Sequence, residues 1–284
     1  MAAIDEATAG RTHVTEQARH SREGLSPAVV LGRRFRALSL DLWFTALYYS
    51  PERDYQWKED RVQLLRGALR TRRGQGLGVK TVEGVMDSVH AQLRAQGREP
   101  ITVDPEVLIP LYADALNAKL TLPLDEFARA YSRVGLAEHP PVANPEAVSV
   151  VHALTESEIP VISITNTARR GATWQEYLRD RMNLEFRHVV ASSDCGSAKP
   201  DPAIFQEAAK RLGLETHEIL HVGDRWELDV KGASAAGCGA ALYSGLWRRY
   251  PDGLYPPTDP KFTDGSIVPR IERLEQLLSG DLFK

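Results

Sequence analysis

The chain has 284 residues, of which 43% are hydrophobic and 26% are charged, and its formal net charge is −3. This length and composition are typical of a globular protein with one large domain, or one domain plus an insertion. The near-neutral charge argues against nucleic acid or a membrane surface as a partner. No apolar run is long enough to span a membrane, and two cysteines are too few for a disulfide framework, so we expect a cytoplasmic protein.

The N-terminal segment 1–32 has mixed charge and little periodicity, so we expect a disordered tail there. It has neither the basic start nor the apolar stretch of a secretory signal. The apolar run 37–40 that follows predicts a buried strand, and this strand ends at Asp41. An aspartate in that position is held at the edge of the sheet where α/β proteins place their ligands.

From 49 to 142 the pattern becomes helical. Apolar residues recur at spacings of three and four in four stretches: a first helix from Pro51 that ends near Gly74, then helices over about 82–93, from Pro105, and over about 124–134. Four amphipathic helices with no strand between them predict a small bundle. A proline-rich linker closes this segment.

Beyond the linker, strands alternate with helices, which predicts parallel βαβ units. The expected helices cover about 145–156, 170–182, 202–212 and 226–237, and the expected strands cover 160–164, 188–190, 219–222 and 240–243. A last amphipathic helix is predicted from the apolar residues Ile267, Ile271, Leu274, Leu277 and Leu278. The predicted fold class is α/β, with a Rossmann-like, doubly wound parallel sheet core over 33–48 and 143–284. An all-helical domain over 49–142 is inserted after the first strand.

Three further polar clusters follow predicted strands or precede predicted helices. They are Thr165-Asn166, Lys199 in the segment 196–202, and Asp224 with Asp229 five residues later. Each cluster alone is more often a helix cap or a solvated loop residue. Because the carboxyl ends of parallel strands meet at one edge of a sheet, these clusters and Asp41 together indicate a site.

The chemistry of this set is coherent. The carboxylates of Asp41, Asp224 and Asp229 are oxygen ligands of the kind that Mg²⁺ prefers. The Lys199 cation would balance the charge of a nucleophilic Asp41 and of a phosphoryl group. A bound Mg²⁺ would let an anionic carboxylate approach an anionic phosphate, and attack by Asp41 would form an aspartyl-phosphate.

The order of these motifs resembles that of the haloacid dehalogenase-like (HAD) hydrolase superfamily. The motifs are Asp41-Leu-Trp-Phe-Thr45, Ile164-Thr165-Asn166, Lys199-Pro200-Asp201-Pro202 and Gly223-Asp224 with Asp229. The helical insertion is similar to the C1 cap of that family, and most of its members are Mg²⁺-dependent phosphatases.

The resemblance implies a role for each of these residues. Asp41 would be the nucleophile and a metal ligand, together with the backbone carbonyl of Trp43. Thr165 and Asn166 would bind the phosphoryl group, and Lys199 would orient and neutralise it. Asp224 would hold Mg²⁺, with Asp229 beside it or behind it. Tyr48, which leads toward the cap, and the Trp43 side chain are further candidates for substrate contact.

The departure from the family pattern is Trp43, which stands where phosphatases of the family usually carry a second aspartate. That aspartate protonates the leaving group and later activates water, and an indole does neither. General acid–base catalysis typically contributes about 10²–10⁴-fold. Turnover should therefore be slower but not abolished, and acyl or aryl phosphates should be better substrates than alkyl phosphates.

Two alternatives remain beside a Mg²⁺-dependent phosphatase acting on a small phosphorylated metabolite. A 2-haloacid dehalogenase needs no proton donor, because halide leaves as an anion. Asp224 argues against this activity, since an unneutralised carboxylate would repel the carboxylate of a haloacid. The other alternative is a protein of low or no activity that binds a phosphorylated ligand or partner. No signal in the sequence indicates an oligomeric state.

Overall fold

The computed structural model describes residues 31–48, 51–246 and 268–284, with the backbone alone at 51–56. The tail predicted at 1–32 therefore lies almost wholly outside the described residues. A six-stranded sheet with the order β10-β9-β8-β1-β6-β7 forms the centre of the core, and its strand pairs are all parallel. Its strands are β1 (Ala37–Leu40), β6 (Val161–Thr165), β7 (Val189–Ala191), β8 (Ile219–Gly223), β9 (Gly239–Tyr243) and β10 (Arg270–Ile271).

The order in which strands are added to the sheet reverses at β1: β6 and β7 extend the sheet on one side of β1, and β8, β9 and β10 extend it on the other. Leu40 lies opposite Val222 of β8 on one side and Ser163 of β6 on the other. The carboxyl ends of β8, β1 and β6 are therefore neighbours, which brings together the residues that follow them. Such a point is where open α/β sheets bind ligands.

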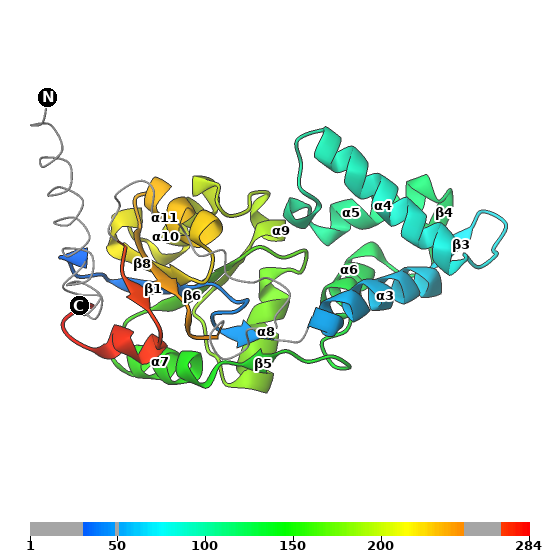
Figure 1. The fold of residues 1–284 in the computed structure, drawn as a ribbon. Coiled ribbons are helices and arrows are strands. Elements are labelled where there is room, and N and C mark those ends of the chain that lie inside the picture. Colours follow the sequence, from blue (N-terminus) through cyan, green and yellow to red (C-terminus); the bar gives the residue numbers. More distant parts are fainter. Residues whose placement is uncertain (1–30, 49–50, 247–267) are drawn as a thin grey trace, which may run out of the picture.

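Helices cover both faces of the sheet, which explains why every residue of β1, β6 and β8 is buried. One face packs against α7 (Pro145–Glu156) and α8 (Gly171–Met182), and the other against α10 (Pro202–Leu212) and α11 (Lys231–Ala235). Figure 1 shows α7 and the pair α10 and α11 on opposite sides of the strands. The short helices α9 (Ser192–Cys195) and η2 (Thr216–Glu218) connect these layers.

Several helix starts follow directly from local sequence. Asn144, Asp104 and Asp201 each precede a proline, and each side chain accepts a hydrogen bond from the backbone N–H two residues later. An Asn or Asp cap followed by proline at the first helical position satisfies a free N–H and presets the helical backbone. The predicted ranges 145–156 and 202–212 are confirmed as α7 and α10.

The insertion forms a helical cap with its own hydrophobic core. Its helices are α3 (Pro51–Ala68), α4 (Val79–Ala95), η1 (Pro100–Thr102), α5 (Pro105–Ala115) and α6 (Leu124–Arg133). The first helix ends at Ala68 rather than near Gly74, because Leu69–Thr71 forms strand β3, which pairs antiparallel with β4 (Ala118–Leu120). The helical cap is thus confirmed, but the prediction that it is all-helical is wrong, because β3 and β4 form a two-stranded ribbon within it.

A second ribbon connects the cap and the core. It consists of β2 (Leu47–Tyr48) and β5 (Val142–Ala143), which pair antiparallel. Asn144 donates from its side chain to the Thr45 carbonyl at 2.9 Å and from its backbone to the Ala46 carbonyl at 2.8 Å. We propose the core–cap boundaries, 48/49 and 142/143, at this ribbon.

The end of the chain differs from prediction. The prediction of a last amphipathic helix is wrong: Arg270–Ile271 forms β10 on the edge of the sheet, and Leu274–Leu278 forms the 3₁₀ helix η4. The buried pair Leu274 and Leu277 is spaced by three, which suits a 3₁₀ turn as well as an α-helix. Ile267 lies outside the described residues. The helix predicted over 226–237 is divided into a π-helical turn, η3 (Trp226–Val230), and α11. Among the described helices, none has the length and hydropathy of a membrane span.

Candidate active site

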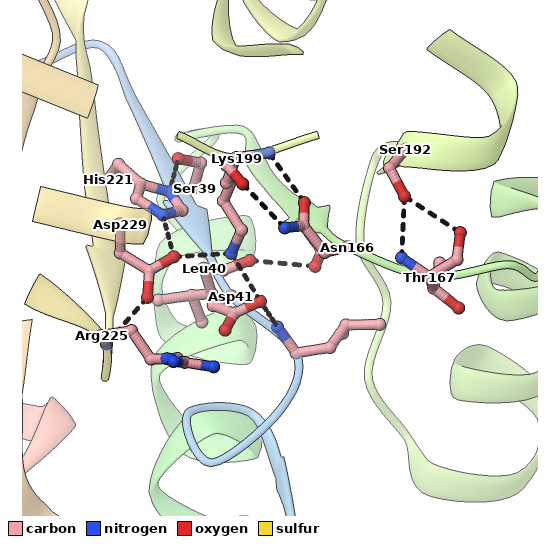
Figure 2. Close-up of polar contacts among 12 residues, drawn as sticks. Ser39, Leu40, Asp41, Asn166, Thr167, Ser192, Lys199, His221, Arg225 and Asp229 are labelled. Atoms are coloured by element: carbon pink, nitrogen blue, oxygen red, sulfur yellow. Dashed lines mark hydrogen bonds and ion pairs between the residues drawn. The ribbon is translucent and has the colours of Figure 1, made fainter. Parts of the chain in front are cut away.

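The predicted polar residues meet at the carboxyl edge of the sheet. Asp41 directly follows β1, Asn166 follows β6, and Asp224 follows β8. Lys199 reaches the same place from the loop between α9 and α10. Figure 2 shows Lys199 between Asp41 and Asp229, with Asn166 beside it.

Lys199 is a buried cation shared by two carboxylates. Its Nζ lies 2.7 Å from Asp41 Oδ1 and 2.6 Å from Asp229 Oδ1, and the whole residue is 4% exposed. The Leu42 N–H also donates to Asp41 Oδ1, at 2.8 Å. Both contacts of Asp41 use the same oxygen, so within the described residues Oδ2 carries no hydrogen bond. Asp41 lines the cavity described below, which leaves Oδ2 as its atom for a ligand.

The electrostatics of the two carboxylates differ. Burial raises the pKa of Asp41 to about 6, although the Lys199 ammonium acts in the opposite direction. Burial would also raise the pKa of Asp229, but Lys199 and a hydrogen bond from His221 outweigh it and hold that pKa below its ordinary value. Burial disfavours the charge of Lys199 as well, yet the two carboxylates raise its pKa. Asp229 and Lys199 therefore form a buried ion pair.

A chain of buried residues supports Asp229 from behind. His221 Nε2 lies 3.2 Å from Asp229 Oδ1, and His221 Nδ1 lies 2.7 Å from Ser39 Oγ. Because burial lowers the pKa of His221, the ring is neutral. Its proton must then be on Nε2, since the Asp229 carboxylate only accepts, and the Ser39 hydroxyl donates to Nδ1. The Arg225 N–H donates to Asp229 Oδ2 at 2.9 Å, so both oxygens of Asp229 are engaged.

Sequence reasoning placed His221 in the core but missed this contact, and it missed Ser39 altogether. Neither residue belongs to a motif, and both lie inside buried strands. The nearby Gly223 is needed for the same arrangement. A Cβ atom there would lie 2.2–2.6 Å from three atoms of the Asp229 side chain. Any other residue at this position would displace the carboxylate that Lys199 binds.

Asn166 and Thr165 have different environments. The Asn166 amide donates to the Lys199 carbonyl at 2.9 Å and accepts from the Lys199 N–H at 2.8 Å, so it fixes the lysine backbone (Figure 2). Asn166 also lines the cavity, whereas Thr165 does not. The Thr165 hydroxyl is buried and has no hydrogen-bond partner within the described residues. Thr167, which was not predicted, lines the cavity, and its N–H donates to Ser192 Oγ at 2.9 Å.

The Trp43 side chain contacts both domains. Its ring centroid lies 5.4 Å from that of Trp57 on α3 of the cap and 5.4 Å from that of Trp174 on α8 of the core. The next residue, Phe44, has a φ of 56°, which turns the chain sharply after the motif. Trp43 lines the cavity. Tyr48 lies on β2, packs against the core cluster and is not among the lining residues.

A cavity of about 670 Å³ extends from Asp41 to the cap. Volumes of this order hold small organic ligands. The core contributes Lys199, Asp224, Arg225 and Leu228 to its wall, together with the segment 166–169 that follows β6. The cap contributes aromatic, charged and apolar side chains, among them Trp57, Lys58, Arg61, Met86, Asp87, His90, Arg94, Glu99 and Tyr131.

The acidic residues fit a divalent cation. Asp41, Asp224 and Asp229 are all buried, and one oxygen from each lies within 4.8 Å of the others. Three carboxylates this close are the hard oxygen donors that Mg²⁺ prefers. Asp229 already accepts hydrogen bonds at both oxygens, so Asp41 and Asp224 are the carboxylates better suited to direct coordination.

Comparisons with known proteins agree with this geometry. A family model described as haloacid dehalogenase-like hydrolase matches residues 106–237. A glyceraldehyde 3-phosphate phosphatase from Methanopyrus kandleri is 35% identical over 105 residues, which cover 37% of this chain and 42% of that protein. Haloacid dehalogenase-like hydrolase domain-containing protein 3 from Bos taurus is 33% identical over 111 residues, covering 39% and 41%. The chain thus spans less than half the length of these relatives.

Two solved structures share the fold over most of the chain. A 2-haloacid dehalogenase from Pseudomonas syringae pv. Tomato DC3000 has a TM-score of 0.54 and 22% identity, and covers 86% of this chain and 96% of its own. A HAD phosphatase from Thermococcus onnurineus has a TM-score of 0.53 and 18% identity, covering 87% and 99%. The family model and these curated relatives both point to haloacid dehalogenase-like hydrolases, and the two solved structures share the capped α/β fold.

Proposed function

We propose that this protein is a hydrolase of the haloacid dehalogenase-like family, a Mg²⁺-dependent phosphatase that acts on a small phosphorylated metabolite through an aspartyl-phosphate at Asp41. The observation that carries the proposal is the state of Asp41. Lys199 and the Leu42 N–H hold one carboxylate oxygen, and the other oxygen has no hydrogen bond within the described residues, at the bottom of a cavity that Asp224 also lines. The curated relative named as a glyceraldehyde 3-phosphate phosphatase supports a small phosphorylated substrate.

The metal would be held by Asp41, Asp224 and the backbone carbonyl of Trp43, with Asp229 beside them as the counter-ion of Lys199. When bound, Mg²⁺ neutralises the negative charge that the carboxylates and the phosphoryl group bring together. Asn166 fixes the backbone of Lys199, and Lys199 orients Asp41. Asn166, which lines the cavity, is the proposed phosphoryl-binding residue after β6. The same role for Thr165 stays a prediction, because its buried hydroxyl has no partner within the described residues and Thr165 does not line the cavity.

The reaction has two displacements at phosphorus. In the first, Asp41 Oδ2 forms a bond to phosphorus while the bond from phosphorus to the leaving oxygen breaks, and the leaving group departs with the electron pair. In the second, a water oxygen attacks the same phosphorus, the bond to Asp41 breaks, and the water protons pass to solvent and inorganic phosphate. Splitting one displacement into two is the gain of covalent catalysis.

Trp43 determines which leaving groups suit this site. Without a carboxylic acid at this position, the leaving oxygen must depart unprotonated or take its proton from water. Aryl and acyl phosphates have stable leaving anions and are the expected substrates, whereas alkyl phosphates should react slowly. The aromatic wall formed by Trp43, Trp57 and Tyr131 also suits a planar leaving group.

Dehalogenation is the second candidate, because the fold is shared with a 2-haloacid dehalogenase and halide needs no proton. The buried Asp224 favours phosphoryl chemistry, since it would repel the carboxylate of a haloacid in the absence of metal. Halide release from 2-chloropropionate in the presence of chelator would support dehalogenation, and no release would exclude that substrate. It stays a prediction that the protein binds a small-molecule substrate and neither nucleic acid nor a membrane. A cytoplasmic location also stays a prediction.

The test is a panel of aryl, acyl and alkyl phosphates, including glyceraldehyde 3-phosphate, assayed with Mg²⁺ and with chelator. We expect phosphate release that needs Mg²⁺, is fastest for aryl or acyl phosphates, and is lost in Asp41→Asn. The matched control is Asp180→Asn, which removes a surface carboxylate paired with Arg179. Activity that persists in Asp41→Asn would refute the nucleophile. An Asp41→Asn variant that still binds these compounds, alongside an inactive wild type, would instead favour the binding-only alternative.

A further inference from the structure

Among the described side chains of the cap, three cations line the cavity, and one of them differs from the other two. Lys58 is paired with Asp87 at 3.1 Å, and Arg94 is paired with Glu99 at 3.6 Å. Arg61 lines the same cavity and has no ion pair with any described residue. Of the described cap cations that line the cavity, Arg61 is therefore the one without a carboxylate partner.

The surroundings of Arg61 hold its guanidinium in place without neutralising it. The guanidinium carbon lies 5.2 Å from the centre of the Tyr131 ring, a cation–π distance. The Arg61 Nε is buried and has no hydrogen-bond partner within the described residues. A buried donor without a partner is costly, and it marks a position where a ligand oxygen would be stabilised.

The carboxylates of the described cap residues that line the cavity, Asp87 and Glu99, are paired with other cations. His90 also lines the cavity, and its Nε2 lies 2.6 Å from the Tyr112 hydroxyl. Burial lowers the pKa of His90, with the charges of Arg94 and Arg61 acting in the same direction and Asp87 against it, which favours the neutral ring. Asp87 is the nearby acid on the same helix, and it is paired with Lys58. An anion that entered this part of the cavity would find a cation with free donors.

The two ends of the cavity thus have complementary chemistry. Asp41, Lys199 and Asp224 form the phosphoryl end, Trp43 and Trp57 form an aromatic middle, and Arg61 stands on the cap wall. We propose that Arg61 is a specificity-determining residue that binds a second anionic group, a carboxylate or a phosphate, on the leaving-group side of the substrate. The inference rests on the proposed phosphatase function and names its substrate class: an aryl or acyl phosphate that carries a second negative charge.

Two probes of the same shape test this inference. In 4-carboxyphenyl phosphate the ring carries a carboxylate, and in 4-carbamoylphenyl phosphate it carries a neutral amide. Affinity is measured by titration calorimetry with Mg²⁺ in the Asp41→Asn variant, so that turnover does not interfere. A hydrogen-bonded ion pair with Arg61 should favour the carboxylate probe about tenfold or more.

Removal of the cation should abolish this preference. In Asp41→Asn with Arg61→Gln we expect equal affinity for the two probes, and the amide probe should bind as before. The matched control is Asp41→Asn with Arg94→Gln, which removes an equal positive charge from the cap wall of the cavity. Arg94 is already paired with Glu99, so the preference for the carboxylate probe should persist in this variant. Equal affinity for both probes before any change at Arg61 would overturn the inference, and so would a preference that survives Arg61→Gln.

The proposed function and this inference fail separately. If the wild-type protein hydrolyses neither probe, the phosphatase proposal is contradicted for aryl phosphates, while the affinity ratio still decides the role of Arg61. If it hydrolyses both with equal KM and equal affinity, the phosphatase proposal stands and the anion site at Arg61 is refuted. The ratio of the affinities for the two probes is measured in Asp41→Asn with Arg61 intact. It tests the anion site even if the Arg61 variant folds poorly.

Discussion

Replacing Asp229 by asparagine tests whether this carboxylate is the structural counter-ion of Lys199. The substitution keeps the size of the side chain and its capacity to accept from the Arg225 N–H, but it removes the charge that faces the Lys199 ammonium at 2.6 Å. Asp229 is 1% exposed and Lys199 is 4% exposed, so water cannot replace the lost partner. The lysine would retain only Asp41, at 2.7 Å.

Breaking a buried ion pair by removing one partner typically costs about 3–5 kcal/mol. Because Asp41 still pairs with Lys199, we expect the lower end, about 3 kcal/mol. For a domain of the size of this core, each kcal/mol shifts Tm by about 2–4 °C, so Asp229→Asn should lower Tm by about 6–12 °C.

The assay is differential scanning calorimetry in the presence of chelator, so that metal binding contributes nothing to either melting temperature. The control is Asp201→Asn, which removes one negative charge while keeping the N-cap of α10, since Asn caps helices as well as Asp. It should melt within about 1 °C of the wild type. If Asp229→Asn also melts that close to the wild type, the ion pair with Lys199 does not stabilise the core and the assigned role of Asp229 is wrong.

Two further predictions concern Trp43 and the thiols. Trp43→Asp should raise the kcat/KM for alkyl phosphates relative to aryl phosphates, by up to about 10²–10⁴-fold if the carboxyl acts fully as general acid. The control, Trp43→Phe, should leave that ratio unchanged. An unchanged ratio in both variants would mean that proton transfer does not limit the alkyl reaction. Burial raises the pKa of Cys195 to about 11 and that of Cys238 to about 12. These raised pKa values keep both thiols protonated at pH 8. Alkylation of Cys195 by iodoacetamide should therefore be roughly 100-fold slower than that of an unperturbed cysteine. Alkylation is followed by mass spectrometry of the folded protein, and a rapid reaction would contradict the burial of this side chain.

The parts of the fold that follow local rules could be predicted from sequence. The strand 37–40 and the helices after Asn144 and Asp201 have the predicted bounds, because apolar runs and capped prolines fix them without help from distant residues. The chain end could not be predicted in this way. Its apolar residues Ile271, Leu274 and Leu277 fit a helical period, but the open edge of β9 pairs with Arg270–Ile271 and makes that segment a strand.

The same distinction applies to the site. The approach of Asp41, Asp224 and Lys199 follows from the order of parallel strands, so motif positions were enough to predict it. The roles of Ser39 and His221 were not accessible, because they depend on which buried side chains of adjacent strands face Asp229. The isolation of Arg61 likewise depends on which cap carboxylates are already paired, and no sequence pattern contains that information.

The contact of Trp43 with Trp57 has a consequence for domain exchange between relatives. A residue of the first motif and a residue of the first cap helix form one packing unit, although they belong to separate domains. A chimaera that joins this core to the cap of a phosphatase with aspartate in the Trp43 position would remove Trp57, the cap partner of the indole, and leave its contact with Trp174 of the core. Residues 43 and 57 should therefore be transplanted together, and the chemistry at position 43 is inherited with the cap as well as with the core.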